Sequence, residues 1–194
     1  MDEVVNLIYN FFPKGVPFDD IKYTTSEEHT RLYRKRSGFE GKSKFLAELQ
    51  RVLPNHAIVD WTNLDEYNCM QFKILTLENQ QIMDDDLELI KTLGGSRIEL
   101  VFYVSVLGNF YYYKYVQTNY EDGEWTFNNP IVLNDAMINM NSRIDLLMSG
   151  NAYIKLDHSI CKYVVSDIET ELLNFGEVTI FNCLFTELET AGTA

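Results

Sequence analysis

Residues 97–120 read RIELVFYVSVLGNFYYYKYVQTNY, and this stretch decides the fold. Two runs rich in β-branched and aromatic side chains lie on either side of Gly108-Asn109. Runs of this composition are typical of strands, and a glycine at the first of two central positions favours a type II′ turn. The sequence therefore predicts an antiparallel β-hairpin in which Leu107 lies opposite Phe110.

Strand side chains alternate between two faces, so this register assigns every residue of the hairpin to a face. One face is expected to meet the core; it carries Leu100, Phe102, Val104, Val106, Tyr111, Tyr113 and Tyr115. The other face is amphipathic; it carries Glu99, Val101, Tyr103, Ser105, Leu107, Phe110, Tyr112, Lys114 and Val116. The group of Tyr103, Tyr112 and Lys114 on this second face is expected to be either covered by a helix or a contact surface for a partner.

Before the hairpin, the hydrophobic pattern changes from helical to alternating near Ala57. Helical periodicity predicts three helices within residues 1–56: one that Pro13 ends, one that begins at Thr25 with capping-box spacing to Glu28, and one over 43–53. Alternation predicts strands at 57–61 and 69–77, and a short helix is expected from Asp84 to Gly95.

After the hairpin, Glu124–Asn128 can extend the sheet through the turn Glu121-Asp122-Gly123. Helices are expected over 134–148 and 157–173, and the apolar run 178–185 is expected to be a buried central strand. We therefore predict one α+β domain over residues 1–194, with a helical part at 1–56. Residues 57–194 should form an antiparallel sheet of about five or six strands with two to three later helices, and the helices of both parts should pack on it.

The charge of the chain is concentrated in its second part. The formal net charge is −13; residues 1–56 hold nine Lys/Arg and eight Asp/Glu, whereas residues 57–194 hold seven and twenty-one. Such a field repels nucleic acid and anionic membranes and attracts basic proteins. The composition therefore favours a basic protein as partner, although many proteins are acidic only for solubility.

Acidic side chains at loops and helix starts are the candidate contacts, because adjustable contacts usually lie on loops. Together with the hairpin group, the candidate partner-binding residues are Asp65, Glu66, Tyr103, Tyr112, Lys114, Glu121, Asp122, Glu124, Asp167, Glu169 and Glu171.

No pattern in the sequence points to catalysis, a cofactor or a metal. The three histidines are scattered, and G-x-S-x-G, P-loop and G-x-G-x-x-G motifs are absent. Asp84-Asp85-Asp86 is interpreted as a helix start, the basic run 31–36 as a solvated helix face, and the three cysteines as reduced core residues. An acidic N-terminus and the lack of a long apolar run favour a cytoplasmic protein.

Three stretches together resemble the immunity-type proteins that bacteria carry beside polymorphic toxins. They are Tyr9–Gly15 (YNFFPKG), the helix from Asp84 to Gly95, and the segment from Asp167 to Glu187. The resemblance implies a stoichiometric inhibitor that covers an essential surface of a cognate toxin, and many such toxins are nucleases with basic clefts. A general adaptor or scaffold domain, and an unrecognised enzyme or small-molecule binder, remain alternatives; the sequence does not predict an oligomeric state.

Overall fold

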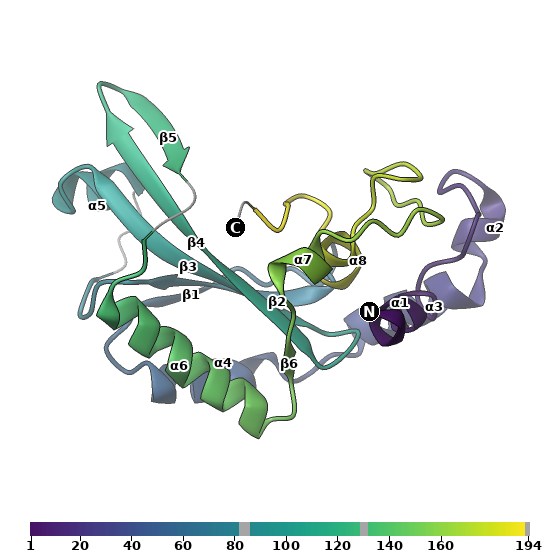
Figure 1. Cartoon of the computed structure of the whole chain (residues 1–194), viewed down its shortest axis with the longest axis horizontal. Helices are drawn as coiled ribbons and strands as arrows, with labels where there is room; N and C mark the ends of the chain where they lie inside the picture. The colour runs from purple at the N-terminus through teal and green to yellow at the C-terminus, as the bar shows by residue number, and fades with distance from the viewer. Residues whose placement is uncertain (82–85, 129–131, 193–194) are drawn as a thin grey trace.

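The computed structural model describes residues 1–81, 86–128 and 132–192. An antiparallel sheet has the strand order β1 (Ile58–Asp60), β2 (Cys69–Leu75), β3 (Ser96–Ser105), β4 (Phe110–Glu121) and β5 (Glu124–Asn128). A sixth strand, β6 (Ile154–Lys155), pairs in parallel with the start of β4. The predicted α+β class and the antiparallel sheet of five to six strands are confirmed (Figure 1).

Helices precede and follow the strands along the chain. They are α1 (Asp2–Ile8), α2 (Ile21–Thr24), α3 (Glu27–Ser37), α4 (Lys42–Val52), α5 (Asp86–Thr92), α6 (Asp135–Gly150), α7 (His158–Cys161) and α8 (Ile180–Leu184). The residue that caps α3 is Ser26, whose hydroxyl accepts from His29 N–H at 3.1 Å, so the expected capping by Thr25 is wrong. Thr25 instead donates to the backbone oxygen of Ile21. The expected helix start at Asp84-Asp85 lies outside the described residues.

The central hairpin forms with its predicted faces but with a different register. Tyr103 pairs with Tyr112, whereas the two-residue turn would have placed Tyr103 opposite Lys114. The connection is longer because Val106 N–H bonds to the backbone oxygen of Asn68 at 2.9 Å instead of to β4. A shift of two residues leaves each side chain on its predicted face, because side chains alternate with a period of two.

Gly108 packs closely against α1 and does not adopt the turn conformation that was expected for it. Its φ is not among the positive values, so the expected type II′ turn does not form. A Cβ at this position would lie 2.5 Å from Cδ2 of Leu7 in α1. The hairpin loop therefore lies against α1, and a larger residue at position 108 would require the Leu7 side chain to move.

Two helices, α4 and α6, cover the face of the sheet that was predicted to meet the core (Figure 1). The ring of Phe45 in α4 stacks on that of Phe72 in β2, with centroids 5.7 Å apart. The Tyr115 hydroxyl donates to Oδ1 of Asn141 in α6 at 2.7 Å. One helix therefore packs on β2 and the other on β4.

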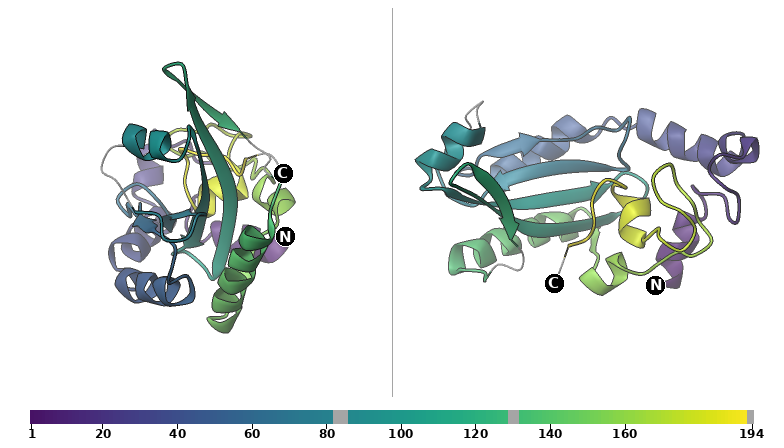
Figure 2. Two further views of the ribbon diagram at one scale, coloured as in Figure 1. Left: turned by 90° about the vertical axis from the view of Figure 1, so that its left-hand side faces the viewer. Right: turned by 90° about the horizontal axis from the view of Figure 1, so that it is seen from above.

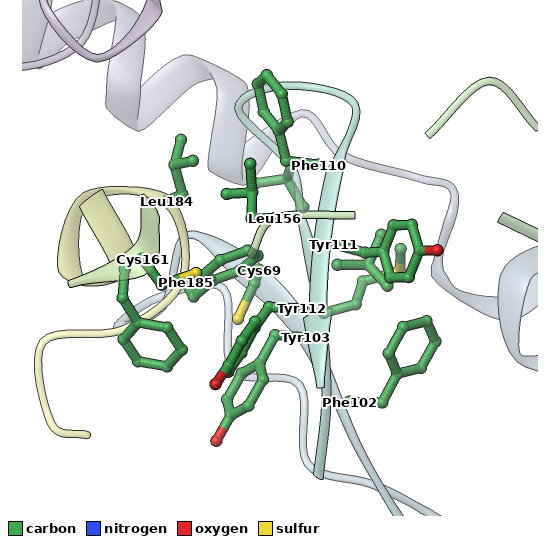
Figure 3. Packing of buried hydrophobic residues seen from close by; sticks show 14 of the residues in the cluster. Cys69, Phe102, Tyr103, Phe110, Tyr111, Tyr112, Leu156, Cys161, Leu184 and Phe185 are labelled. Atoms are coloured by element: carbon green, nitrogen blue, oxygen red, sulfur yellow. The ribbon is translucent and has the colours of Figure 1, made fainter. Parts of the chain in front are cut away.

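The opposite face is covered by α8 and the chain that follows it. Phe181 of α8 packs edge-on against Tyr103 and Tyr112, with ring centroids 5.2 and 5.7 Å apart. Figure 3 shows Tyr103 and Tyr112 on one side of the hairpin and Phe102 and Tyr111 on the other. The hairpin therefore has a buried layer on both faces.

The expected central strand over 178–185 is wrong, because residues 180–184 form helix α8. A capping box begins the helix: Thr179 Oγ1 accepts from Asn182 N–H at 3.3 Å, and Asn182 Oδ1 accepts from Thr179 N–H at 3.0 Å. The run is apolar on all sides because the whole helix is buried. A short apolar run fits a buried helix as well as a buried strand, and the Thr179-x-x-Asn182 spacing was the overlooked signal.

The expected helix over 157–173 is also wrong beyond its first turn, α7. After it, Val165 N–H bonds to the backbone oxygen of Val178 at 2.8 Å, and Ile180 N–H to that of Tyr163 at 2.9 Å. These long-range bonds use backbone N–H and C=O groups that a helix would pair within itself. The segment consequently runs beside the start of α8 and reaches the N-terminal helices.

Candidate functional site

The predicted group of Tyr103, Tyr112 and Lys114 is covered by the C-terminal segment. The Tyr103 hydroxyl donates to Glu189 Oε2 at 2.6 Å, and Lys114 Nζ donates to the same oxygen at 2.9 Å. The Tyr112 hydroxyl donates to the backbone oxygen of Ala191 at 2.7 Å. This group was expected to be either covered or a contact surface for a partner. The structure shows that it is covered, and Tyr103 and Tyr112 are buried.

Glu189 accepts most of the hydrogen bonds that hold the C-terminal segment on this group. Gln71 Nε2 donates to its second carboxylate oxygen at 2.9 Å. Burial alone would raise the pKa of Glu189, but the charge of Lys114 and the hydrogen bonds from Tyr103, Lys114 and Gln71 hold it below its usual value. The ionised carboxylate therefore fastens the C-terminal segment to the sheet.

A second predicted group, Glu121, Asp122 and Glu124, forms the exposed tip of the β4–β5 hairpin. Positive φ angles of 52° at Asp122 and 88° at Gly123 fit a two-residue type I′ turn. Figure 2 shows this hairpin and α5 at one end of the molecule, with α2 and α3 at the other. The tip is a projection with exposed carboxylates.

Asp167 is engaged within the chain. Its carboxylate accepts from the Tyr9 hydroxyl at 2.8 Å and lies 3.3 Å from Lys14 Nζ. Its backbone oxygen accepts from Gly15 N–H at 2.8 Å. Asp167 therefore joins the start of the chain to its last third, and the neighbouring Glu169 is half-buried.

The remaining predicted residues, Asp65, Glu66 and Glu171, meet at one cavity of about 340 Å³. Its apolar lining residues are Phe12, Phe18, Tyr23, Leu32, Leu172 and Leu188. Its polar lining residues are His29, Arg36, Asp65, Glu66, Glu171, Thr186 and Glu187. The cavity thus lies between α2 and α3 on one side and three other segments: residues 65–66 after β1, residues 171–172 and residues 186–188.

Helix α3 supplies one wall through the spacing of its residues. His29, Leu32 and Arg36 are three and four residues apart, which places them on one face of the helix. The Arg36 Nε donates to the backbone oxygen of Leu64 at 2.7 Å. The expectation that the basic run is solvated therefore fails for Arg36, which is half-buried against the opposite wall.

The wall opposite α3 carries Asp65 and Glu66 on a turn organised by Asn63. The side chain of Asn63 accepts from Asp65 N–H at 3.2 Å, and its backbone oxygen accepts from Tyr67 N–H at 2.8 Å. This is the local hydrogen bonding that favours asparagine in turns. Both carboxylates are exposed on this turn at the edge of the cavity.

The third wall consists of two segments of the C-terminal third, residues 171–172 and 186–188, which are joined by a hydrogen bond between Glu187 and Leu172. Glu187 Oε2 accepts from Leu172 N–H at 3.2 Å, and Thr186 Oγ1 accepts from Leu188 N–H at 3.2 Å. Glu171 is exposed beside Leu172 and has no hydrogen bond or ion pair within the described part of the chain. These bonds hold Glu171 and Glu187 on the same wall.

The cavity carries an excess of negative charge. It has the carboxylates Asp65, Glu66, Glu171 and Glu187 against the single guanidinium of Arg36, a formal −3 with His29 neutral. Burial lowers the pKa of Arg36, and the charges of Asp65, Glu187 and Glu66 oppose that shift. Over residues 1–81, 86–128 and 132–192, no cation lies within ion-pair distance of these four carboxylates.

Tyr23 adds a polar group to the apolar wall. Its side chain is 2% exposed, and its ring packs edge-on against Phe18 with centroids 4.9 Å apart. Burial raises the pKa of its phenol, and the charge of Glu187 raises it further. The hydroxyl makes no hydrogen bond to any residue that the structure describes. Tyr23 therefore presents a neutral phenol with unused hydrogen-bonding capacity in the wall of the cavity.

Sequence reasoning missed His29, Arg36, Tyr23 and Glu187 as members of this site. The spacing of His29, Leu32 and Arg36 was the available signal, because it places two polar groups beside a leucine on one helical face. Tyr23 and Glu187 carried no such signal, since only tertiary packing brings them to the cavity.

No three His, Cys, Asp or Glu side chains in the described ranges are grouped to hold a metal ion. No helix in the same ranges is long and apolar enough to cross a membrane. Comparison with protein-family models, with curated proteins and with solved structures finds no match to this chain. Its function is therefore inferred from its own side chains and their placement.

Proposed function

We propose that this chain is a non-enzymatic binding protein that neutralises a cognate toxin, a basic protein, by direct contact at the acidic cavity. One observation carries the proposal: four carboxylates from three parts of the chain surround an apolar wall and face one cation. Three of them, Asp65, Glu66 and Glu171, are residues that the sequence analysis assigned to a partner surface.

The charge of the cavity explains why a basic partner fits. The four carboxylates outnumber the one guanidinium, so a basic partner meets charge of the opposite sign at this cavity. Complementary charge also speeds association and disfavours wrong partners. A basic substrate cleft of a nuclease toxin has the complementary sign, so this binding protein would occupy the surface that such a toxin needs for its substrate.

Two of the three stretches that resemble immunity-type proteins lie at this cavity. These stretches, 9–15 and 167–187, contribute Phe12, Glu171 and Glu187 to the cavity walls. These two stretches also contact each other through Asp167 and Lys14. The residues that suggest the family and the residues that form the cavity thus coincide in part.

Co-expression with the product of the adjacent gene tests the proposal. The expected result is a stoichiometric complex on size-exclusion chromatography, together with survival of cells in which the neighbour alone is toxic. If no complex forms and the cells are not protected, the proposal is wrong. If a complex forms with a harmless neighbour, the general adaptor alternative is favoured instead.

A second candidate function is binding of a small organic cation. The cavity volume of about 340 Å³ lies at the lower end of the range of small-molecule sites, which combine apolar walls with a few converging polar groups. Thermal-shift measurements with small basic compounds distinguish the two functions, because a protein that needs a macromolecular partner is not strongly stabilised by such compounds.

A further inference from the structure

We propose that the cavity receives the side chain of one arginine from the partner protein. This inference rests on the proposed function and names the chemical group that its site would recognise. It depends on the juxtaposition of carboxylates from three separate segments, an aromatic part of the lining and the Tyr23 hydroxyl, which has no hydrogen-bond partner among the described residues.

The distribution of acceptors favours a guanidinium over an ammonium. Asp65 and Glu66 lie on the turn after β1, whereas Glu171 and Glu187 lie on two segments of the C-terminal third, and all four line the same cavity. A guanidinium is planar and directs five N–H donors outward in a fixed fork, so it can bond to acceptors on two sides at once. A lysine ammonium is a compact point charge and keeps most of its hydration.

The aromatic wall favours the same group. Phe18, Tyr23 and His29 form a continuous series, with centroid distances of 4.9 Å for the first pair and 5.6 Å for the second. Guanidinium groups stack on aromatic faces, and the methylene stem of arginine can cover Leu32. The Tyr23 hydroxyl, which lacks a partner among the described residues, can accept one N–H from the entering group.

The cavity already contains one guanidinium, that of Arg36. It is half-buried, and its Nε is used by the backbone oxygen of Leu64. It provides one positive charge against four negative ones, so it leaves capacity for a second cation. It is therefore part of the wall and not the occupant that neutralises the cavity.

The net charge of the chain favours a basic partner protein over a second copy of this chain at the cavity. Each copy carries −13, and pairing two such cavities would bring two groups of unpaired carboxylates together. The grouping of the carboxylates also does not suit a single metal ion in the described part of the chain. A larger organic cation attached to a basic protein satisfies both observations.

Binding of short blocked peptides to the intact protein tests the inference. The probes are acetyl-Gly-Gly-Arg-Gly-Gly-amide and the same peptide with lysine or citrulline in place of arginine, followed by ¹H–¹⁵N NMR. The arginine peptide is expected to give saturable shifts at residues 23–36, 64–66, 171–172 and 186–188. Citrulline should weaken binding at least about tenfold, because the charged hydrogen-bonded pairs are lost, and lysine should bind more weakly than arginine.

A matched pair of variants assigns the binding to the cavity. Asp65→Asn/Glu66→Gln should abolish the arginine-dependent shifts, whereas Glu121→Gln/Glu124→Gln at the hairpin tip should retain them. The inference is overturned by equal binding of the citrulline peptide, by an absence of saturable shifts, or by shifts confined to the tip. Tighter binding of free arginine than of the blocked peptide would also overturn it, since the occupant would then be a small molecule.

The same measurements separate this inference from the proposed function. A toxin complex that forms although the arginine peptide does not bind contradicts only the arginine inference. Arginine binding without a toxin complex or protection of cells contradicts only the proposed function.

Discussion

The Nε of Arg36 donates to the backbone oxygen of Leu64 at 2.7 Å, and this bond joins helix α3 to the turn that carries Asp65 and Glu66. One wall of the acidic cavity is thereby positioned against another. The bond links residues 28 positions apart in the sequence, so it is a tertiary bond and not part of either local structure.

Replacing Arg36 by glutamine should therefore destabilise the fold. The variant loses a hydrogen bond from a charged donor, and we expect the free energy of unfolding to fall by about 1.5 to 3 kcal/mol. Urea unfolding followed by circular dichroism measures this. The control is Arg34→Gln on the exposed side of the same helix, which should change stability by less than about 0.5 kcal/mol. Equal effects of the two changes would show that the bond to Leu64 contributes nothing.

Glu189 should make stability depend on pH. Its pKa is lowered in the folded protein, so its contribution is present above the unfolded value, about 4.3, and is lost as the pH falls through the folded pKa. Glu189→Gln should lower the free energy of unfolding at pH 7 by about 1 to 2 kcal/mol, since the side chain is partly exposed. The difference from the parent should shrink below about pH 4. A difference that stays constant from pH 7 to pH 3 would contradict the assigned role.

Thr179 should matter as the cap of α8. Thr179→Ala removes the hydroxyl that accepts from Asn182 N–H and should cost about 1 to 2 kcal/mol, whereas Thr179→Ser should cost less than about 0.5 kcal/mol. Denaturant unfolding of both variants provides the comparison. If alanine and serine are equally tolerated, the capping box does not stabilise the C-terminal segment.

The three cysteines should be unreactive in the folded protein. Cys69, Cys161 and Cys183 are buried and outside any disulfide, and burial raises the pKa of Cys161 to about 12. The thiolate is the reactive form, so labelling at pH 8 with an aromatic disulfide reagent should proceed only as fast as the chain opens. Release of a full equivalent of the chromophore within seconds from native protein would show that one thiol is accessible.

The sequence predicted the sheet well because its strands are set by local patterns. Alternation in residues 97–120 assigned both faces of the hairpin correctly, although the bond from Val106 to Asn68 shifted the register. The helix expected over 134–148 is confirmed as α6, but the segment 157–185 was predicted poorly, because residues 163–180 bond across the chain instead of within a helix. The apolar run at 178–185 is compatible with a buried strand and with a buried helix. The capping box of Thr179 and Asn182 favours the helix.

The cavity could be predicted only in part for a related reason. Asp65, Glu66 and Glu171 were selected for their charge and their place in loops, and no local pattern linked them to one another. Tertiary packing brings them to one cavity and places Glu121, Asp122 and Glu124 at the other end of the molecule (Figure 2). The sequence therefore selected candidate residues by their type but did not predict which of them share one surface.

The contrast between these two acidic groups allows the most direct measurement. The cavity variant is Asp65→Asn/Glu66→Gln/Glu171→Gln, and the tip variant is Glu121→Gln/Asp122→Asn/Glu124→Gln. Each removes three negative charges and changes the formal net charge from −13 to −10, so general electrostatic attraction is reduced equally. Both variants should remain folded, because within the described residues these carboxylates accept no hydrogen bond and form no ion pair.

Isothermal titration of the cognate toxin with the parent and both variants, at the same ionic strength, then tests the central claim. The cavity variant should bind at least about 100-fold more weakly than the parent, whereas the tip variant should stay within about threefold. If the tip variant loses affinity and the cavity variant keeps it, or if both lose it equally, the acidic cavity is not the binding site.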